Sequence, residues 1–402
     1  MPSHNLNHSG GVFIPTVDQF VGKTTSGEGA SSYMDEVQRL TCRFKPQMEK
    51  FIKDEISLPL WEPTFDLPNL KVPQKHRQFI HDLKIPRARA PHDHLPDMLL
   101  HNLGRFQQDE QLKARIQGLF TTHPTHKIFV NTSGAGKTRA VLEHLCSNWG
   151  LYFSCHDDSH VGSKDVPSAM SNIRKTLNQS TLPHAPNLLV TPADIAAHSR
   201  NKDVYPSDVT EEDVLRSRIA NFKKDVPKSD KFSQALEKNQ QLAGSSLLVP
   251  LLARLLILQQ YIATVQSVDG DLSQMDHKRR WLHLQLHPHL LSSNGQDDLF
   301  HQLGRDLDNY FKKENLDLSQ KIDIIQSLSH EILQSVREAL GLNPRKRKPI
   351  PLYVVIDECQ FTVTDMENHY CSSQWTAKGG ILREMARWWD EVLNRSADGR
   401  RS

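Results

Sequence analysis

Eight consecutive residues, 131–138, have the composition of a phosphate-binding loop (Walker A motif). Glycines let a backbone turn tightly so that its N–H groups point at phosphate oxygens, and a following helix N-terminus adds positive partial charge. In this pattern Lys137 is expected to reach the β- and γ-phosphates of a nucleoside triphosphate, and the Thr138 hydroxyl to bind Mg²⁺. The predicted nucleotide-binding residues are Asn131, Thr132, Ser133, Gly134, Ala135, Gly136, Lys137 and Thr138.

One position departs from the usual pattern GxxxxGK[ST], because Asn131 stands where the pattern has its first glycine. Asparagine tolerates a left-handed backbone better than most residues, so the loop can still form. The alternative interpretation is a Ser/Gly turn that joins a strand to a helix, with Lys137 facing water. The order of strand, loop, Gly-Lys-Thr and helix favours the phosphate site.

A second motif ends the apolar run 352–356, which is followed directly by Asp357 and Glu358. An acidic residue at the carboxyl end of a parallel strand lies at the ligand-binding edge of the sheet. This is the arrangement of a Walker B strand, in which Asp357 would hold Mg²⁺, through water, and Glu358 would act as general base on the attacking water. The alternative is a solvated pair of acidic residues at a strand end.

The elements that must position these residues alternate between strand and helix along the chain. Apolar β-favouring runs and 3.6-residue periods predict strands at 127–130, 151–154 and 352–356, a weaker strand at 187–191, and helices at 139–149 and 164–177. This alternation predicts an α/β fold with the parallel sheet of a P-loop NTPase and a large helical insert. Within that insert, helices are expected at 247–265, 277–285, 298–311 and 319–340.

The domain organisation follows from shifts in composition. Residues 1–32 are expected to be disordered, 33–104 to form a helical lead-in, 105–195 the P-loop part of the core, 196–345 a polar linker and helical insert, and 346–402 the Walker B strand with a following helix. The part at 197–245 fits either a poorly ordered insertion or a loose helical excursion.

The chain end is expected to truncate the core. Only 44 residues follow Glu358, and they contain no second convincing apolar strand. A missing strand would leave a sheet edge and its apolar face uncovered. The predicted sheet is therefore incomplete at the C-terminus.

Composition limits the setting in which this chemistry would operate. A net charge of +2 gives no overall positive field that would attract a nucleic-acid backbone. The five cysteines are scattered and lack CxxC spacing, so they indicate neither a disulfide framework nor a zinc site. No secretion leader is found, and the apolar stretch 247–258 is interrupted and far shorter than the roughly 20 residues of a membrane span, so it predicts a buried helix. The expected setting is intracellular, cytoplasmic or nuclear, without a membrane or nucleic-acid partner.

The motifs together resemble the P-loop NTPase region of Crinkler-like proteins and related large fungal families, in the additional-strand catalytic-glutamate division. The resemblance spans about residues 105–395 and rests on the runs FVNTSGAGKTRAVLEHLCSNWGLYF, RRWLHLQLHP and LYVVIDECQ. It implies an ATPase or switch module, often coupled to a separate effector. It also implies Lys137 and Thr138 as phosphate and Mg²⁺ ligands, Asp357 as the Mg²⁺ residue and Glu358 as the catalytic glutamate.

Three functions remain open at this point. The first is Mg²⁺-dependent hydrolysis of ATP or another nucleoside triphosphate; the second is a nucleotide-dependent switch with little turnover; the third is an interaction scaffold that binds a protein partner or effector and keeps the motifs only as remnants. Tight binding with low turnover distinguishes the second from the first, and absence of binding supports the third.

Weaker signals are interpreted as structural. The histidines around Trp281 include an i, i+4 pair, His283 and His287, but lack an acidic or cysteine partner beside them for a metal site. The basic loop 345–348 is expected to be solvated rather than an import signal or phosphate contact, and Arg139 to serve packing or a salt bridge. The alternative for Trp388 and Trp389 is a partner interface, although helical spacing places one of them in the core.

Overall fold

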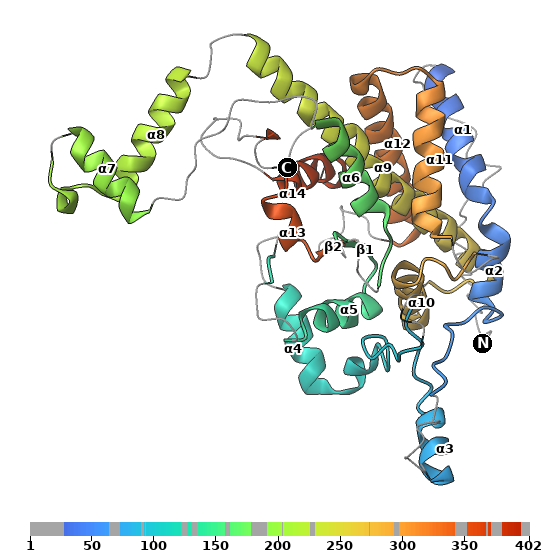
Figure 1. The fold of residues 1–402 in the computed structure, drawn as a ribbon. Helices are drawn as coiled ribbons and strands as arrows, with labels where there is room; N and C mark the ends of the chain where they lie inside the picture. The colour runs from blue at the N-terminus through green and yellow to red at the C-terminus, as the bar shows by residue number, and fades with distance from the viewer. Residues whose placement is uncertain are drawn as a thin grey trace, which may run out of the picture.

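Helices make up most of the described chain, and they surround a small parallel sheet (Figure 1). The computed structural model describes residues 28–63, 73–89, 92, 94–121, 127–129, 135–156, 161–177, 191–202, 204–225, 230–272, 274–292, 297–341, 352–366, 369–370 and 380–394. The predicted 1–32 segment lies outside this part of the chain except for its last residues, and the basic loop 345–348 lies wholly outside it.

The elements follow one another in this order: α1 (Glu28–Cys42), α2 (Lys45–Ile52), α3 (Gln74–Asp82), α4 (Glu110–Thr121), α5 (Lys137–Ser147), β1 (Gly150–Ser154), α6 (Asp165–Leu177), α7 (Pro192–Lys202), α8 (Glu211–Asp225), α9 (Asp230–Val268), α10 (Met275–Leu286), α11 (Leu299–Lys313), α12 (Leu318–Ala339), β2 (Tyr353–Asp357), α13 (Gln360–Val363) and α14 (Ile381–Leu393). Short 3₁₀ turns lie at Arg105–Gln108 and Pro206–Asp208. The described fold is thus a mixed α/β arrangement with a large helical part.

Strands β1 and β2 pair in parallel, with Gly150 opposite Tyr353 and Ser154 opposite Asp357. Their positions confirm the strands predicted at 151–154 and 352–356. One face of the pair, which carries Tyr152, packs against α5 and α10. The other face, which carries Phe153, packs against the helices α6, α9 and α14. Because β1 is covered on both faces, its residues are buried without alternation, as expected for a buried parallel strand.

The strand predicted at 127–130 is wrong over its described part, 127–129, which belongs to no strand. These residues instead follow the end of α4: the Lys127 ammonium donates to the Leu119 carbonyl oxygen, and the Phe129 ring lies 5.6 Å from that of Phe120. Ile128 is 86% exposed, so its β-favouring side chain has no buried surface to join. The weaker strand candidate at 187–191 falls outside the described residues apart from position 191, which is in no strand.

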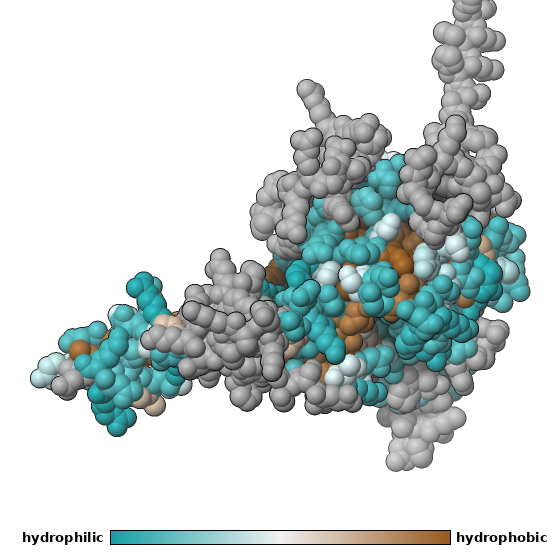
Figure 2. Space-filling view, turned by 90° about the horizontal axis from the view of Figure 1, so that it is seen from above, coloured by the Kyte–Doolittle hydropathy of each residue, from teal (hydrophilic) through white to brown (hydrophobic). Residues whose placement is uncertain are grey.

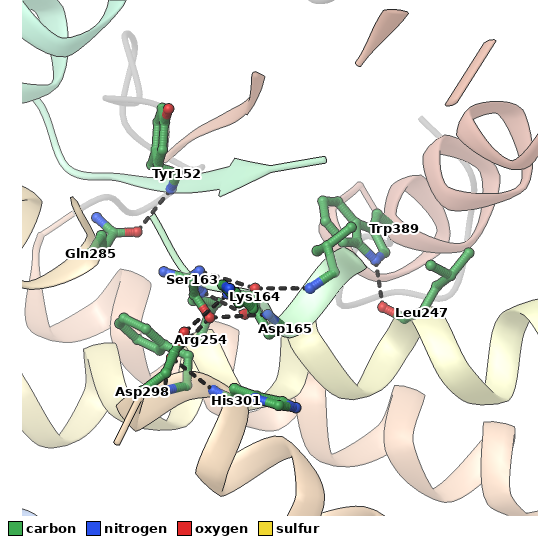
Figure 3. Close-up of polar contacts among 12 residues, drawn as sticks. Tyr152, Ser163, Lys164, Asp165, Leu247, Arg254, Gln285, Asp298, His301 and Trp389 are labelled. Atoms are coloured by element: carbon green, nitrogen blue, oxygen red, sulfur yellow. Dashed lines mark hydrogen bonds and ion pairs between the residues drawn. The ribbon is translucent and has the colours of Figure 1, made fainter. Parts of the chain in front are cut away.

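The edge of β1 that faces away from β2 is covered by two side chains of α10. The Tyr152 backbone N–H donates to Gln285 Oε1 at 2.8 Å (Figure 3), and Gln285 Nε2 donates to the Gly150 carbonyl oxygen at 3.2 Å. The Trp281 indole N–H donates to the same carbonyl at 2.7 Å. At Gly150 and Tyr152, one glutamine amide therefore supplies the donor and the acceptor that a neighbouring strand would supply.

We expect replacement of Gln285 by leucine to lower the free energy of unfolding by about 1–3 kcal/mol, because the buried Tyr152 N–H would lose its acceptor. Urea unfolding followed by circular dichroism measures this change. Gln334→Leu is the matched control, since its amide contacts the exposed Glu338 side chain and its loss should change stability by less than about 0.5 kcal/mol. Equal stability of the two variants would contradict the edge-covering role.

Helix α9 is 39 residues long and forms the centre of the helical part. It packs against α1, α2, α6, α11, α12 and α14, and most side chains from Leu247 to Val265 are buried. By length and hydropathy alone, 234–268 would suffice to cross a membrane, but 83% of its most apolar window is buried inside the protein. The apolar stretch 247–258 is thus a core helix, as predicted.

The described residues of the polar region 197–245 are mostly helical, which fits the helical alternative of the prediction. It holds the end of α7, all of α8 and the first turns of α9. Helices α7 and α8 stand away from the main body as an arm (Figure 1), and the surface of this arm is mostly hydrophilic (Figure 2). Few apolar side chains are available there to pack on the body: Val214 is buried within the arm, whereas Tyr205 is 78% exposed.

The segment that follows β1 is tied to the helical part by buried polar contacts (Figure 3). Arg254 of α9 forms an ion pair with Asp165, at 3.0 Å between Nε and Oδ2, and its guanidinium lies 3.7 Å from the centroid of the Phe300 ring. Asp298 accepts hydrogen bonds from the Ser163 hydroxyl and the Lys164 N–H. A buried arginine requires such a partner, so these contacts fix the turn between β1 and α6.

Helix α14 places one of its two tryptophans in the core, as predicted: Trp389 is buried and Trp388 is partly buried. The Trp389 indole N–H donates to the Leu247 carbonyl oxygen at 2.8 Å (Figure 3), and that of Trp388 donates to the Gln240 carbonyl oxygen. A Cβ on Gly244 would lie 2.5 Å from the Trp388 ring, so α9 needs a glycine at this crossing. Both tryptophans therefore pack against α9.

Candidate functional site

The first turn of α5 and the end of β2 meet at one point. Gly136 precedes α5 with φ 79°, a left-handed conformation that favours glycine, and Lys137 and Thr138 begin the helix. The Thr138 hydroxyl lies 3.1 Å from Asp357 Oδ2, although 219 residues separate the two in sequence. The structure therefore brings together two residues that the motifs assigned independently to Mg²⁺.

Three donors hold the Asp357 carboxylate. Oδ2 accepts the Thr138 hydroxyl and also the Tyr152 hydroxyl, the latter at 2.8 Å, and Oδ1 accepts the Glu358 backbone N–H at 3.0 Å. Burial raises the pKa of the Tyr152 phenol well above its ordinary value, and the nearby Asp357 charge raises it further. The phenol consequently stays protonated and remains a donor.

The strand register explains how Tyr152 reaches this carboxylate. Tyr152 lies opposite Val355, and Ser154 lies opposite Asp357, so Tyr152 and Asp357 share the face of the sheet that α5 covers. The Tyr152 ring points along this face towards the carboxyl ends of the strands. Sequence reasoning did not assign Tyr152 to the site, because its only signal is the pairing of two strands about 200 residues apart.

Glu358 continues beyond the end of β2 in a left-handed conformation, with φ 54°. Such a conformation is uncommon for a residue other than glycine and is found disproportionately at functional sites. Its half-exposed side chain accepts a hydrogen bond from the Gln360 amide. Glu358 thus lies beside Asp357 at the carboxyl end of β2, as the sequence predicts.

Arg139 has the structural use that was expected of it. Its guanidinium donates to Glu143 and to the carbonyl oxygens of Leu99, His101 and Asn102. The Glu143 carboxylate, which is fully buried, also accepts the N–H of Gly104 at 3.1 Å. Arg139 therefore holds the segment before α4 against α5, and its guanidinium group is used in these contacts.

Residues Asn131, Thr132, Ser133 and Gly134 lie outside the described residues. Of the predicted loop, the structure describes the exposed Ala135 and Gly136 and the half-exposed Lys137 and Thr138. The described part of the loop thus opens to the surface at the N-terminus of an 11-residue helix.

The oxygen donors fit a hard cation such as Mg²⁺, which takes one or two protein oxygens and keeps several waters. The single Thr138 proton is donated to Asp357, so the lone pairs of this hydroxyl are left for an ion. Among the described residues no group of three or more His, Cys, Asp or Glu could hold a metal. A site that shares its ion with phosphates and water does not need such a group.

Of the two histidines at i, i+4 spacing, His283 lies in α10 and His287 directly follows this helix. Burial lowers the pKa of His283 to about 3, and His287 Nε2 lies 3.8 Å from Asp97 Oδ2. Among the described residues, neither histidine belongs to a group of three or more His, Cys, Asp or Glu that could hold a metal.

Comparison of the chain with protein-family models, with curated proteins and with solved structures found no match.

Proposed function

We propose that this chain binds a nucleoside triphosphate together with Mg²⁺ at the junction of α5 and β2, and that it hydrolyses the terminal phosphate. The contact between Thr138 and Asp357 carries this proposal. A Gly-Lys-Thr helix start and a strand-end Asp-Glu pair are each common, but their meeting within 3.1 Å is what a shared ion site requires.

Binding of the phosphate tail would depend on the start of α5. The N-terminus of a helix, where the positive end of the helix dipole lies, attracts anions, and Gly136 leaves the approach free of a side chain. A Cβ on Gly136 would meet no atom within 4 Å, so the backbone here faces open space. Lys137 adds a cationic donor on the same turn.

The ion would be held by the Thr138 hydroxyl oxygen and, through water, by Asp357. When bound, Mg²⁺ would neutralise charge on the β- and γ-phosphate oxygens. Asp357 supplies the negative charge that the ion needs, and its contact with Thr138 keeps the hydroxyl oriented. The residues of this chain thus bind and orient both the ion and the tail.

Glu358 is the proposed general base. Its carboxylate lies at the same sheet edge as Asp357, one residue further along the chain, and its half-exposed side chain can accept a proton from water. Attack of that water on the terminal phosphorus forms one P–O bond while the bond to the leaving diphosphate breaks, and the water proton passes to Glu358.

The Gln360 contact favours a second candidate, a nucleotide-dependent switch with little turnover. Glu358 Oε2 accepts the Gln360 amide, and a carboxylate that this contact held away from the terminal phosphate could not orient water there. A chain that keeps this bond with nucleotide bound would bind without hydrolysis, and a protein effector would then read the bound state.

Replacement of Thr138 by valine tests the proposal, because valine keeps the shape of the side chain and removes the hydroxyl. We expect the affinity for a fluorescent ATP analogue in Mg²⁺ to fall roughly tenfold, as is typical when an orienting group of a metal site is lost. Without Mg²⁺ the two proteins should bind equally.

Thr176→Val serves as the control, since the Thr176 hydroxyl donates to the Asn172 carbonyl oxygen on the exposed side of α6. This variant should bind as the wild type does. If Thr138→Val also retained the full affinity in Mg²⁺, the ion site proposed here would be wrong.

A further inference from the structure

The buried hydroxyl of Tyr152 points at Asp357, which belongs to the proposed ion site. Tyr152 is 1% exposed, and its hydroxyl donates to Asp357 Oδ2, the same oxygen that Thr138 contacts. Thr138 approaches from α5, whereas Tyr152 approaches along the sheet from β1. The two donors therefore come from different elements.

We propose that Tyr152 is a positioning residue of the nucleotide site, whose hydroxyl fixes the plane of the Asp357 carboxylate. This inference rests on the proposed function. The terminal torsion of an aspartate is broad, so an unrestrained carboxylate turns easily. Here the Glu358 N–H holds Oδ1 and the Tyr152 hydroxyl holds Oδ2, and these two bonds together define the plane.

The surroundings of Tyr152 hold its ring in place. A Cβ on Gly162 would lie 3.2 Å from Tyr152 Cε1, so the backbone of that turn packs directly on the ring. The ring also belongs to the apolar cluster that includes Leu142, Val161 and Leu286, and the Tyr152 N–H donates to Gln285. A phenol anchored at its backbone and along its ring has little freedom, so its hydroxyl can fix a neighbouring group.

The contact also joins α10 to the site. Gln285 binds the Tyr152 backbone, and the Tyr152 side chain binds Asp357, which lies at the end of the other strand. Loss of a group that orients a metal-binding carboxylate typically lowers metal affinity by about 10- to 100-fold. Tyr152 is therefore proposed to strengthen the binding of the ion, and not to contact the nucleotide.

Tyr152→Phe tests this role because it removes one oxygen and keeps the ring. The measurement is the Mg²⁺ concentration that gives half of the metal-dependent gain in affinity for a fluorescent ATP analogue. We expect this concentration to rise about tenfold, with binding in the absence of Mg²⁺ unchanged. A residue needed only for packing would lower both affinities or neither.

Tyr353→Phe is the matched control, since Tyr353 lies on the same sheet face at the opposite end of β2, beside His144 and Phe120. Its Mg²⁺ response should equal that of the wild type. Substitution of Tyr152 by 4-aminophenylalanine restores a donor at the same place and should recover the wild-type response, which also decides the matter if the phenylalanine variant folds poorly.

Two negative results differ in meaning. A wild type without any Mg²⁺-dependent gain in affinity would overturn the proposed function and this role with it. A wild type that responds to Mg²⁺, with an unchanged half-saturation in Tyr152→Phe or no recovery by the amino analogue, would overturn the role of Tyr152 alone.

Discussion

Replacement of Glu358 by glutamine is expected to reduce phosphate release by about 100- to 10,000-fold while Mg²⁺-dependent binding of ATP stays intact. Glutamine keeps the size of the side chain but cannot accept a proton from water. The left-handed backbone at position 358 is kept as well, because the substitution changes only the end of the side chain. Single-turnover phosphate release, measured beside equilibrium binding, separates the two effects.

Glu331→Gln on the exposed side of α12 is the control for the loss of one negative charge. It should release phosphate as the wild type does. A Glu358→Gln protein that hydrolyses ATP at the wild-type rate would exclude Glu358 as the general base. If the wild type binds ATP tightly and releases no phosphate, the switch is favoured over the hydrolase.

Replacement of Lys137 by alanine should weaken ATP binding by about 10- to 100-fold, which corresponds to one charge-assisted contact with the phosphate tail. Alanine is at least as good a helix former as lysine, so α5 should keep its stability. Isothermal titration with ATP in Mg²⁺ gives the affinity, and thermal unfolding verifies the fold.

Lys113→Ala provides the comparison, because Lys113 is a surface lysine of α4 that pairs with Glu110. Its ATP affinity should be that of the wild type. Equal weakening in both variants would indicate a general effect of charge, and no weakening in Lys137→Ala would contradict a phosphate site at the start of α5.

The elements with strong periodic or apolar patterns could be predicted from the sequence. Strands β1 and β2 are apolar runs that the fold buries or half-buries, and α12 ends before Gly341, whose φ of 65° is that of a glycine closing a helix. Asp317 begins the same helix with a capping box to Gln320. In these places local chemistry and tertiary packing favour the same structure.

Prediction from the sequence was less accurate where local chemistry and tertiary packing favour different structures. The region 197–245 has few large apolar residues, yet much of it is rich in good helix formers, such as the run 235–243, and its described residues are mostly helical. The run 127–130 has the propensity of a strand, but its described part lies against α4 instead of a sheet. Propensity is a weak guide for so short a segment.

The site was predictable only in part for a similar reason. Thr138 and Asp357 could each be assigned because their motifs have a known mechanism, and the structure places them in contact. The contact between Tyr152 and Asp357 depends on which strands pair and in which register, which no local pattern records. The covering of the β1 edge by Gln285 depends on the same information.

Binding of a nucleoside triphosphate through Mg²⁺ at the start of α5 and the end of β2 can be measured by calorimetric titration of the wild-type chain with ATP. One titration contains Mg²⁺ and the other contains EDTA. We expect saturable binding at one site per chain in Mg²⁺ and clearly weaker binding in EDTA. A folded wild type that binds no ATP in Mg²⁺, or binds it equally well in EDTA, would show that no such site exists.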